Sequence, residues 1–305
     1  MTSLLYPWLI ILLSLTTIFF AFRKRWIVSG VCFILAILLN WYSECFALNL
    51  IRSNRNAQNQ GFRLMSWNIH TDSTDNKAKL SRLAKTILEN APDLIFITEI
   101  KGNAADSLNM ILSKDFPYST YDNFNQTSWY HIYSKSPMYE SKAVAANILR
   151  IVTQIGNDTI CVYGCHFTSN NFDIFNNYIT PEKVQSYRQA ANYIKNISYA
   201  SNLRKWDSYM LVDNLKNSVY PTFIIGDLND VAKSPSLNIL ANAGFKDAWW
   251  NAGFGYGATV HHPFPYRIDH ILFKGKNNLK LKAIKKIRAN GLSDHDALVA
   301  DFSLE

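Results

Sequence analysis

The sequence has a set of acidic, amide and histidine side chains, most of which stand at the end of a short apolar run. They are Asn68, Glu99, His166, Asp227, Asn229, Asp269, Asp294 and His295. Carboxylate and amide oxygens of this kind bind hard divalent cations such as Mg²⁺ or Mn²⁺ rather than zinc. Two histidines add groups that change charge near neutral pH. A cation, a base and a hydrogen-bond donor are the functions that hydrolysis of a phosphate ester requires.

The apolar runs around these residues predict the elements that position them. The runs are short and rich in β-branched and aromatic residues, which favours strands over helices. They cover residues 63–67, 94–98, 160–165, 222–225 and 266–268. Asp227 and Asn229 are two residues apart, so on an extended chain both side chains point to one side.

Helical patterns lie between some of these runs. Residues 77–90 repeat apolar side chains at helical spacing and stop before Pro92, and residues 181–197 and 236–243 show similar patterns. Strands dominate, so we expect packed sheets with helices outside. Residues 171–180 and 199–220 are rich in Asn, Tyr and Ser, and we expect loops or short helices there. Because they interrupt the chain between His166 and Asp227, we expect them to border the substrate cleft.

Six short motifs contain all eight of these polar residues and follow one another in order. They are Ser66-Trp67-Asn68, Ile97-Thr98-Glu99, Gly164-Cys165-His166-Phe167, Gly226-Asp227-Leu228-Asn229, Arg267-Ile268-Asp269-His270 and Ser293-Asp294-His295. Each is short, but the order resembles the endonuclease/exonuclease/phosphatase superfamily with its DNase I-like fold, from Phe62 to Phe302. The resemblance implies an α+β domain, a four-layer α/β/β/α sandwich of two mostly antiparallel sheets with the site at one edge.

The resemblance also implies a metal site. Glu99 would be the main ligand of Mg²⁺ or Mn²⁺, with Asn68 and Asp294 close by. The sequence departs from the family at two positions beside these motif residues. Thr98 stands where the family usually has Gln, and His70 stands where endonuclease members often have Asp, which puts a second metal contact in doubt.

The remaining motif residues would carry the hydrolysis itself. By the same resemblance, Asp227 and Asn229 would align the attacking water and the scissile phosphate. His295 would act as the base, held in its tautomer by Asp269. His166 would donate to a phosphate oxygen in the transition state, although no carboxylate partner for it is evident in the sequence.

Simpler interpretations compete at several positions. Gly-Asp-x-Asn forms an ordinary turn after a strand in most proteins. His270 is predicted to be structural, on the opposite strand face from Asp269, whereas His261 and His262 either line the pocket or belong to a loop. Two cysteines, Cys161 and Cys165, lie four residues apart on a predicted strand, too far for a disulfide, which predicts buried free thiols.

The first fifty residues have a different composition. Residues 4–22 and 26–43 carry no charge, and Arg23-Lys24-Arg25 separates them. Each run is about long enough to span a membrane. A signal peptide is less consistent, because the positive charge follows the apolar stretch, and core helices would normally keep a polar face. The sequence therefore predicts a membrane hairpin over 1–50, a linker over 51–61 and a catalytic domain over 62–305.

Charge and composition limit the function further. The chain has 305 residues, 48% hydrophobic and 18% charged, which excludes a disordered protein, and its four cysteines form no CxxC pair. The net charge is +8, and half of the excess lies in residues 1–60, so the domain is only mildly basic. Basic loops stay cytoplasmic, so we expect the tip with Arg23-Lys24-Arg25 inside and the domain on the extracytoplasmic side of a plasma or inner membrane.

The combined prediction is a membrane-anchored, Mg²⁺-dependent phosphoesterase. Its substrate would be a phosphate ester of a nucleic acid, a phospholipid or an inositol phosphate, and no obligate protein partner is inferred. The alternative is a catalytically silent binding or scaffold module on the same fold. Neither the substrate, nor endo or exo attack, nor the oligomeric state follows from the sequence.

Overall fold

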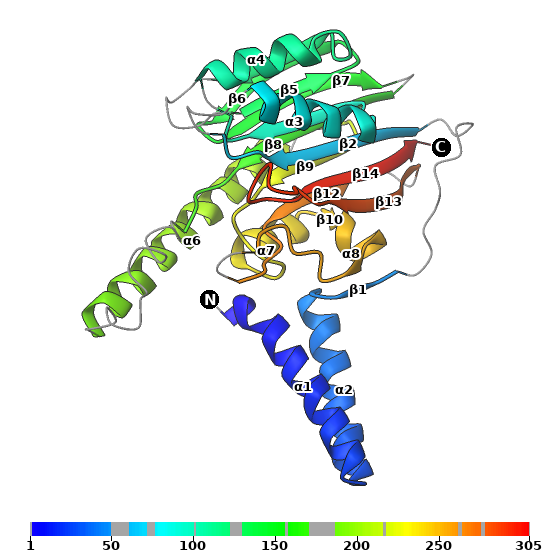
Figure 1. The fold of residues 1–305 in the computed structure, drawn as a ribbon, viewed down its shortest axis with the longest axis vertical. Helices are drawn as coiled ribbons and strands as arrows, with labels where there is room; N and C mark the ends of the chain where they lie inside the picture. The colour runs from blue at the N-terminus through cyan, green and yellow to red at the C-terminus, as the bar shows by residue number, and fades with distance from the viewer. Residues whose placement is uncertain are drawn as a thin grey trace.

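A computed structural model gives the structure of the chain. It describes residues 2–49, 61–71, 77–100, 102–122, 130–155, 158–170, 187–215, 218–261, 264–275 and 278–304. A layered domain with two packed sheets lies above a helical hairpin that extends away from it (Figure 1).

The domain is built on two six-stranded sheets. The first has the order β13-β14-β2-β3-β5-β4 and the second β10-β12-β9-β8-β7-β6. The strands of the first are β2 (Gly61–Asn68), β3 (Leu94–Thr98), β4 (Tyr118–Asp122), β5 (Tyr130–Ser134), β13 (Leu279–Ile287) and β14 (Ala297–Leu304). Those of the second are β6 (Met138–Ala145), β7 (Ile148–Ile155), β8 (Asp158–His166), β9 (Thr222–Asp227), β10 (Lys246–Asp247) and β12 (Asp269–Lys274). Neighbours are antiparallel except β2 with β3 and β8 with β9, which confirms the predicted mostly antiparallel sandwich.

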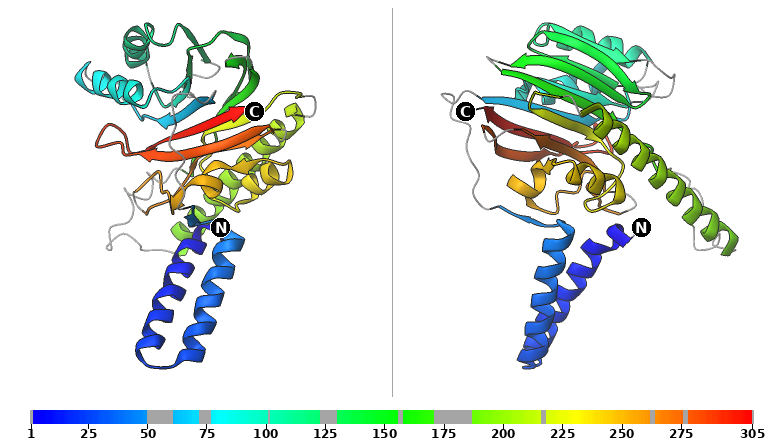
Figure 2. Two further views of the ribbon diagram at one scale, coloured as in Figure 1. Left: turned by 90° about the vertical axis from the view of Figure 1, so that its right-hand side faces the viewer. Right: turned by 180° about the vertical axis from the view of Figure 1, so that it is seen from behind.

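Helices cover the outer faces of both sheets (Figures 1 and 2). On the first sheet lie α3 (Lys77–Asn90) and α4 (Gly102–Leu112), and on the second lie α6 (Tyr187–Leu215) and α7 (Pro235–Asn242). The reason is visible in α3, where Leu80, Leu83 and Ile87 recur every three or four residues and are buried against the sheet. A separate apolar core, which includes Phe96 and Phe223, fills the space between the sheets.

The two parallel strand pairs create the functional edge. In the first sheet Asn68 is level with Thr98, so the chain after both strands emerges at one place. In the second sheet His166 is level with Asp227, and β12 begins opposite Asp227 at Asp269. Because parallel neighbours end at the same edge of a sheet, residues from distant parts of the sequence meet there.

Two predicted elements are wrong in extent. The loops or short helices expected over 199–220 are mostly one helix, since α6 runs continuously from Tyr187 to Leu215. Its buried stripe includes the polar Arg204 and Ser208, which hides the helical repeat. The strand expected over 266–268 begins only at Asp269, because Tyr266 pairs with Val260 in an isolated bridge. Residues 171–186 lie outside the described part of the chain.

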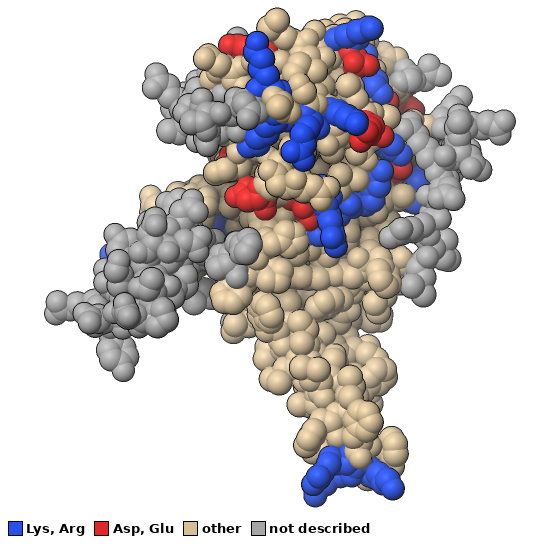
Figure 3. Space-filling view, viewed as in Figure 1, with Lys and Arg blue, Asp and Glu red and all other residues tan. Residues whose placement is uncertain are grey.

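The hairpin consists of α1 (Tyr6–Phe22) and α2 (Trp26–Ser43), which pack antiparallel. Both are long and apolar enough to cross a membrane by length and composition, and only 11% and 17% of their apolar windows are buried. The charged tip, Arg23-Lys24-Arg25, lies at the end farthest from the domain, and the rest of the hairpin surface seen in Figure 3 is uncharged.

The hairpin is tied to the domain by defined contacts. After α2, the short β1 (Ala47–Leu48) pairs with β11 (Phe254–Gly255), next to α8 (Ala248–Ala252). The side-chain amide of Asn49 donates to the carbonyls of Trp250 and Gly253, at 2.9 and 3.1 Å. Lys233 forms a 2.6 Å ion pair with Glu44. These contacts were not predicted, and most of the linker expected over 51–61 falls outside the described residues.

Candidate active site

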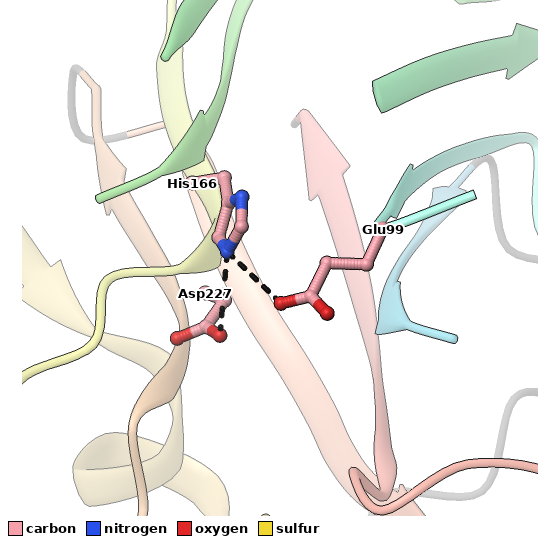
Figure 4. A group of neighbouring side chains, drawn as sticks. All are labelled: Glu99, His166 and Asp227. Carbon is pink, nitrogen blue, oxygen red and sulfur yellow. Dashed lines mark ion pairs between the residues drawn. The ribbon is translucent and has the colours of Figure 1, made fainter. Parts of the chain in front are cut away.

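A carboxylate surrounded by nitrogen donors forms one half of the functional edge. Glu99 follows β3 in a left-handed backbone conformation with φ of 57°. Its Oε1 accepts a 2.8 Å hydrogen bond from Asn68 Nδ2 and lies 3.2 Å from His166 Nε2. Figure 4 shows His166 between Glu99 and Asp227, with its Nε2 directed at both carboxylates. Glu99 is therefore the carboxylate partner of His166 that the sequence did not reveal.

A buried histidine with two carboxylates forms the other half. His295 Nδ1 lies 2.8 Å from Asp269 Oδ2, and its Nε2 lies 3.9 Å from Asp227 Oδ2. The backbone carbonyl of His295 accepts a 2.9 Å hydrogen bond from the Trp67 indole. Because Asp269 accepts a hydrogen bond from the N–H at Nδ1, the ring presents Nε2 to the interior of the site.

The loop after β9 holds Asp227 and Asn229 in place. Gly226 has φ of 138°, and a Cβ there would collide with the carbonyl oxygen of Cys165, so the motif requires glycine. Asn229 also has a positive φ, 50°, and its backbone N–H donates to Asp227 Oδ1 at 2.8 Å. Its side-chain amide donates to the carbonyl of Phe167 at 2.8 Å. Strained backbone of this kind persists where the surrounding structure fixes it, often at functional sites.

The two halves have opposite electrostatics. Burial alone would raise the pKa of Glu99, but hydrogen bonds from His166, His70 and Asn68 outweigh it and hold the pKa far below its usual range. Burial and the neighbouring Asp269 charge raise the pKa of Asp227 to about 6. Burial would lower the pKa of His295, yet the attraction of Asp269 and Asp227 raises it to about 10. Without a cation, the cluster therefore holds His295 in its charged form.

The donor set fits a hard divalent cation. Ligand atoms of Glu99, His166 and Asp227 all lie within 4.8 Å of one another. Asp294 is exposed at the same edge, and the Ser293 hydroxyl donates to the carbonyl of Asn68 at 2.7 Å while lying 3.3 Å from Asp294 Oδ1. Carboxylate and amide oxygens with access to solvent are suited to Mg²⁺ or Mn²⁺. Glu99 and Asp227 are therefore placed to hold an ion, whereas Asn68 and Asp294 stay predicted ligands.

Sequence reasoning missed one direct contact with this cluster. His70 Nδ1 lies 2.7 Å from Glu99 Oε2, so the residue that departs from the family pattern contacts the expected metal ligand. Its position two residues after Asn68 was the sequence feature that could have indicated this contact.

A buried arginine was also missed. Arg204 of α6 is 2% exposed, and its Nε lies 3.1 Å from Asp230 Oδ2. Its Nη1 donates to the carbonyl of Thr168 and to Asn170 Oδ1, at 2.8 and 2.9 Å. A single arginine in a helix gives no sequence signal of such a role. The contact places the middle of α6 against the loops that follow His166 and Asn229. That this segment borders the substrate cleft stays a prediction.

His261, His270 and two cysteines lie outside the cluster. His270 is fully buried, faces Asp247, and has its Nε2 2.9 Å from the carbonyl of Asp230, as expected of a structural residue. His261 forms a 3.0 Å pair with Asp296 and is half exposed, and His262 is outside the described residues. Both Cys161 and Cys165 are buried free thiols, as predicted.

Comparison with known proteins agrees with this geometry. The model of the endonuclease/exonuclease/phosphatase family matches residues 65–295. The chain belongs to this family. Its members are generally phosphoric ester hydrolases that use a divalent metal, and the predicted resemblance is confirmed. No curated protein matches the sequence significantly.

Solved structures of the family share the fold. An endonuclease/exonuclease/phosphatase from Bacteroides vulgatus has a TM-score of 0.61 at 16% identity, over 80% of this chain and 99% of its own. D. rerio TDP2 complexed with single strand DNA product has a TM-score of 0.59 at 15% identity, over 80% of this chain and 100% of its own. The 3′ phosphatase NExo from Neisseria, in a variant form bound to product DNA hairpin, has a TM-score of 0.58 at 14% identity, over 79% of this chain and 99% of its own. At such identity the likeness establishes the fold alone.

Proposed function

We propose that this protein is a membrane-anchored, Mg²⁺-dependent hydrolase of phosphodiester or phosphomonoester bonds. The observation that carries the proposal is that two dissimilar clusters meet where the two packed sheets end at the same edge of the domain. Glu99 accepts hydrogen bonds from nitrogen donors in a partly exposed position, and His295 is oriented by Asp269 in a buried one. One cluster is suited to hold a cation and the other to move a proton, which are the two requirements of phosphate ester hydrolysis.

The residues suggest how the reaction proceeds. When bound, the cation would polarise the phosphoryl oxygens. In its neutral form, with Nδ1 bonded to Asp269, His295 would take a proton from water at Nε2. Asp227 lies 3.9 Å from that atom and, with Asn229, would orient the water. His166 Nε2 lies 4.0 Å from the same oxygen, Asp227 Oδ2, and would donate to a phosphate oxygen.

The substrate class is part of the proposal. The family neighbours described above include two with DNA product bound, which supports a nucleic acid ester. A phospholipid or inositol phosphate would suit a membrane anchor. Both classes present the same phosphate chemistry to the site, so a substrate screen separates them.

The test uses the full chain in nanodiscs. We expect hydrolysis of bis(p-nitrophenyl) phosphate, DNA, RNA or phospholipid with Mg²⁺ or Mn²⁺, and none in EDTA. Glu99→Gln should lose the activity, whereas Glu89→Gln, an exposed glutamate on α3, should retain it. Hydrolysis that persists unchanged in EDTA would contradict metal dependence. Complete inactivity on every substrate class would favour the binding or scaffold module.

The anchor and its orientation belong to the same proposal. A core helix would be mostly buried, but the hairpin exposes apolar side chains such as Leu15 and Leu38 along its length. Its basic tip, Arg23-Lys24-Arg25, favours the cytoplasmic side, which would put the domain outside. Protease added to intact cells should digest the domain. A domain protected from protease, with an active cytoplasmic reporter fused after Glu305, would show the opposite orientation.

A further inference from the structure

The longest helix of the domain extends past its body. A 29-residue helix such as α6 is about 43 Å long. Its carboxyl-terminal half packs on the domain, where Leu211 joins the core beneath α7. Its amino-terminal half slants away from the sheets, down to the level at which the hairpin meets the domain, in each of the views of Figures 1 and 2.

A shared cavity shows where α6 lies relative to the start of the hairpin. Ile197 and Ser201 of α6 line a small cavity together with Ser3 and Leu4, which precede the first apolar helix. Ile197 is therefore level with the start of α1. Residues 187–196 continue beyond this point for about 15 Å.

The composition of this end suits a membrane surface. Residues 187–199 contain three tyrosines and two basic residues, and none is acidic. Among those whose side chains the structure describes, Lys195, Asn196 and Tyr199 are exposed. Tyrosines and basic side chains are enriched where protein meets lipid headgroups, since the ring lies at the boundary between headgroups and acyl chains and the cation meets the phosphates.

We propose that the amino-terminal end of α6, residues 187–199, lies in the headgroup layer of the membrane that contains α1 and α2. The proposal rests on the membrane anchoring proposed above. The occupant is the lipid surface because this end lies beside the start of the apolar hairpin, across the small cavity that Ser3 and Leu4 line.

The contact would reach the catalytic edge. Arg204 stands two helical turns after Ile197 and joins α6 to Asp230 and to the carbonyl of Thr168. Asp230 directly follows Asn229, and Thr168 is two residues after His166. The membrane would therefore hold the site through two attachments, the hairpin and α6, and fix its height above the lipid.

Site-specific fluorescence tests the proposal on the full chain in nanodiscs. In a Cys32→Ala background the other cysteines are buried, so single introduced cysteines carry the NBD dye. The positions are Asn196→Cys at the end of α6, Leu15→Cys in the middle of α1 and Met110→Cys on α4, at the opposite end of the domain. We expect headgroup nitroxide lipids to quench Asn196→Cys several-fold more than Met110→Cys. Acyl-chain nitroxide lipids should quench Leu15→Cys.

The outcomes separate this proposal from the anchor. The dye at Leu15→Cys could be quenched while the dye at Asn196→Cys is quenched no more than the dye at Met110→Cys. That result would overturn the α6 contact but would still support the membrane anchor. Absence of quenching at all three positions would overturn both.

Charge reversal supplies a matched second test. In nanodiscs with anionic lipid, Lys195→Glu should reduce the headgroup quenching at Asn196→Cys. Lys114→Glu, an exposed lysine after α4, should leave it unchanged. Equal quenching in both variants would count against the contact.

Discussion

The two halves of the catalytic edge use similar residue types in different surroundings. The Glu99 side chain is 25% exposed and accepts hydrogen bonds from Asn68 and His70, so it stays charged. Asp227 and Asp269 are 2% and 1% exposed and share one histidine, so their charges compete. The comparison teaches that the surroundings, rather than the carboxylate itself, prepare one half for a cation and the other for a proton.

The largest expected effect comes from removing the base. His295→Ala should lower turnover at least about a hundredfold, the usual contribution of a general base. Asp269→Asn should lower turnover less, because Asp269 orients the His295 ring and does not itself take the proton. His261→Ala removes a half-exposed histidine outside the cluster and serves as the control. The measurement is kcat of the full chain at saturating Mg²⁺, and near wild-type kcat in both variants would refute the assigned roles.

Metal affinity should separate the two halves more directly. Glu99→Gln should weaken binding of Mn²⁺ about 10- to 100-fold, because it removes the main charged ligand. Asp227→Asn should weaken it less, since that carboxylate is buried against His295. Isothermal titration calorimetry measures both dissociation constants without relying on activity. Equal losses in the two variants would show that the halves form one metal site.

The fold was predictable where the sequence repeats a simple pattern. Short apolar strands and the stripe of α3 were recognised from spacing alone. In contrast, α6 was not recognised beyond residue 197, because its buried face includes the polar Arg204 and Ser208. Arg204 pairs with Asp230, elsewhere in the chain, and the Ser208 hydroxyl donates to the carbonyl of Arg204 one turn earlier. The pairing of β1 with β11 joins residues about 200 positions apart and has no local signal.

The site was predictable to the extent that its residues end strands. The eight residues were identified by type and order, and the parallel pairs β2–β3 and β8–β9 explain why Asn68 lies beside Glu99 and His166 beside Asp227. The partner of His166 was missing because Glu99 belongs to the other sheet, and sequence order carries no information on how two sheets face each other. Their catalytic roles remain predictions.

The smallest expected effect is a pH dependence of stability in the metal-free protein. The pKa of His295 in the folded state, about 10, lies above its ordinary value near 6.5. Its stabilising contribution is therefore fully present below about pH 6.5 and is lost as pH rises through about 10. The pKa of Asp227 is also raised, to about 6, so its contribution to stability also falls as pH rises. That loss is complete by about pH 7 and adds nothing above it.

We therefore expect the metal-free full chain in EDTA to lose about 1–2 kcal/mol of unfolding free energy between pH 7 and pH 9, below the limit of about 1.4 kcal/mol per pH unit for one proton. Thermal unfolding followed by tryptophan fluorescence measures it. The loss should shrink in Asp269→Asn, which removes the charge that holds the proton on His295. Saturating Mg²⁺ should also reduce it, because a cation near Asp227 takes over the neutralisation that His295 provides. A Tm that is constant or rises from pH 7 to pH 9 in EDTA would mean that the buried half is not held together by a charged histidine, and the contrast between the halves would fail.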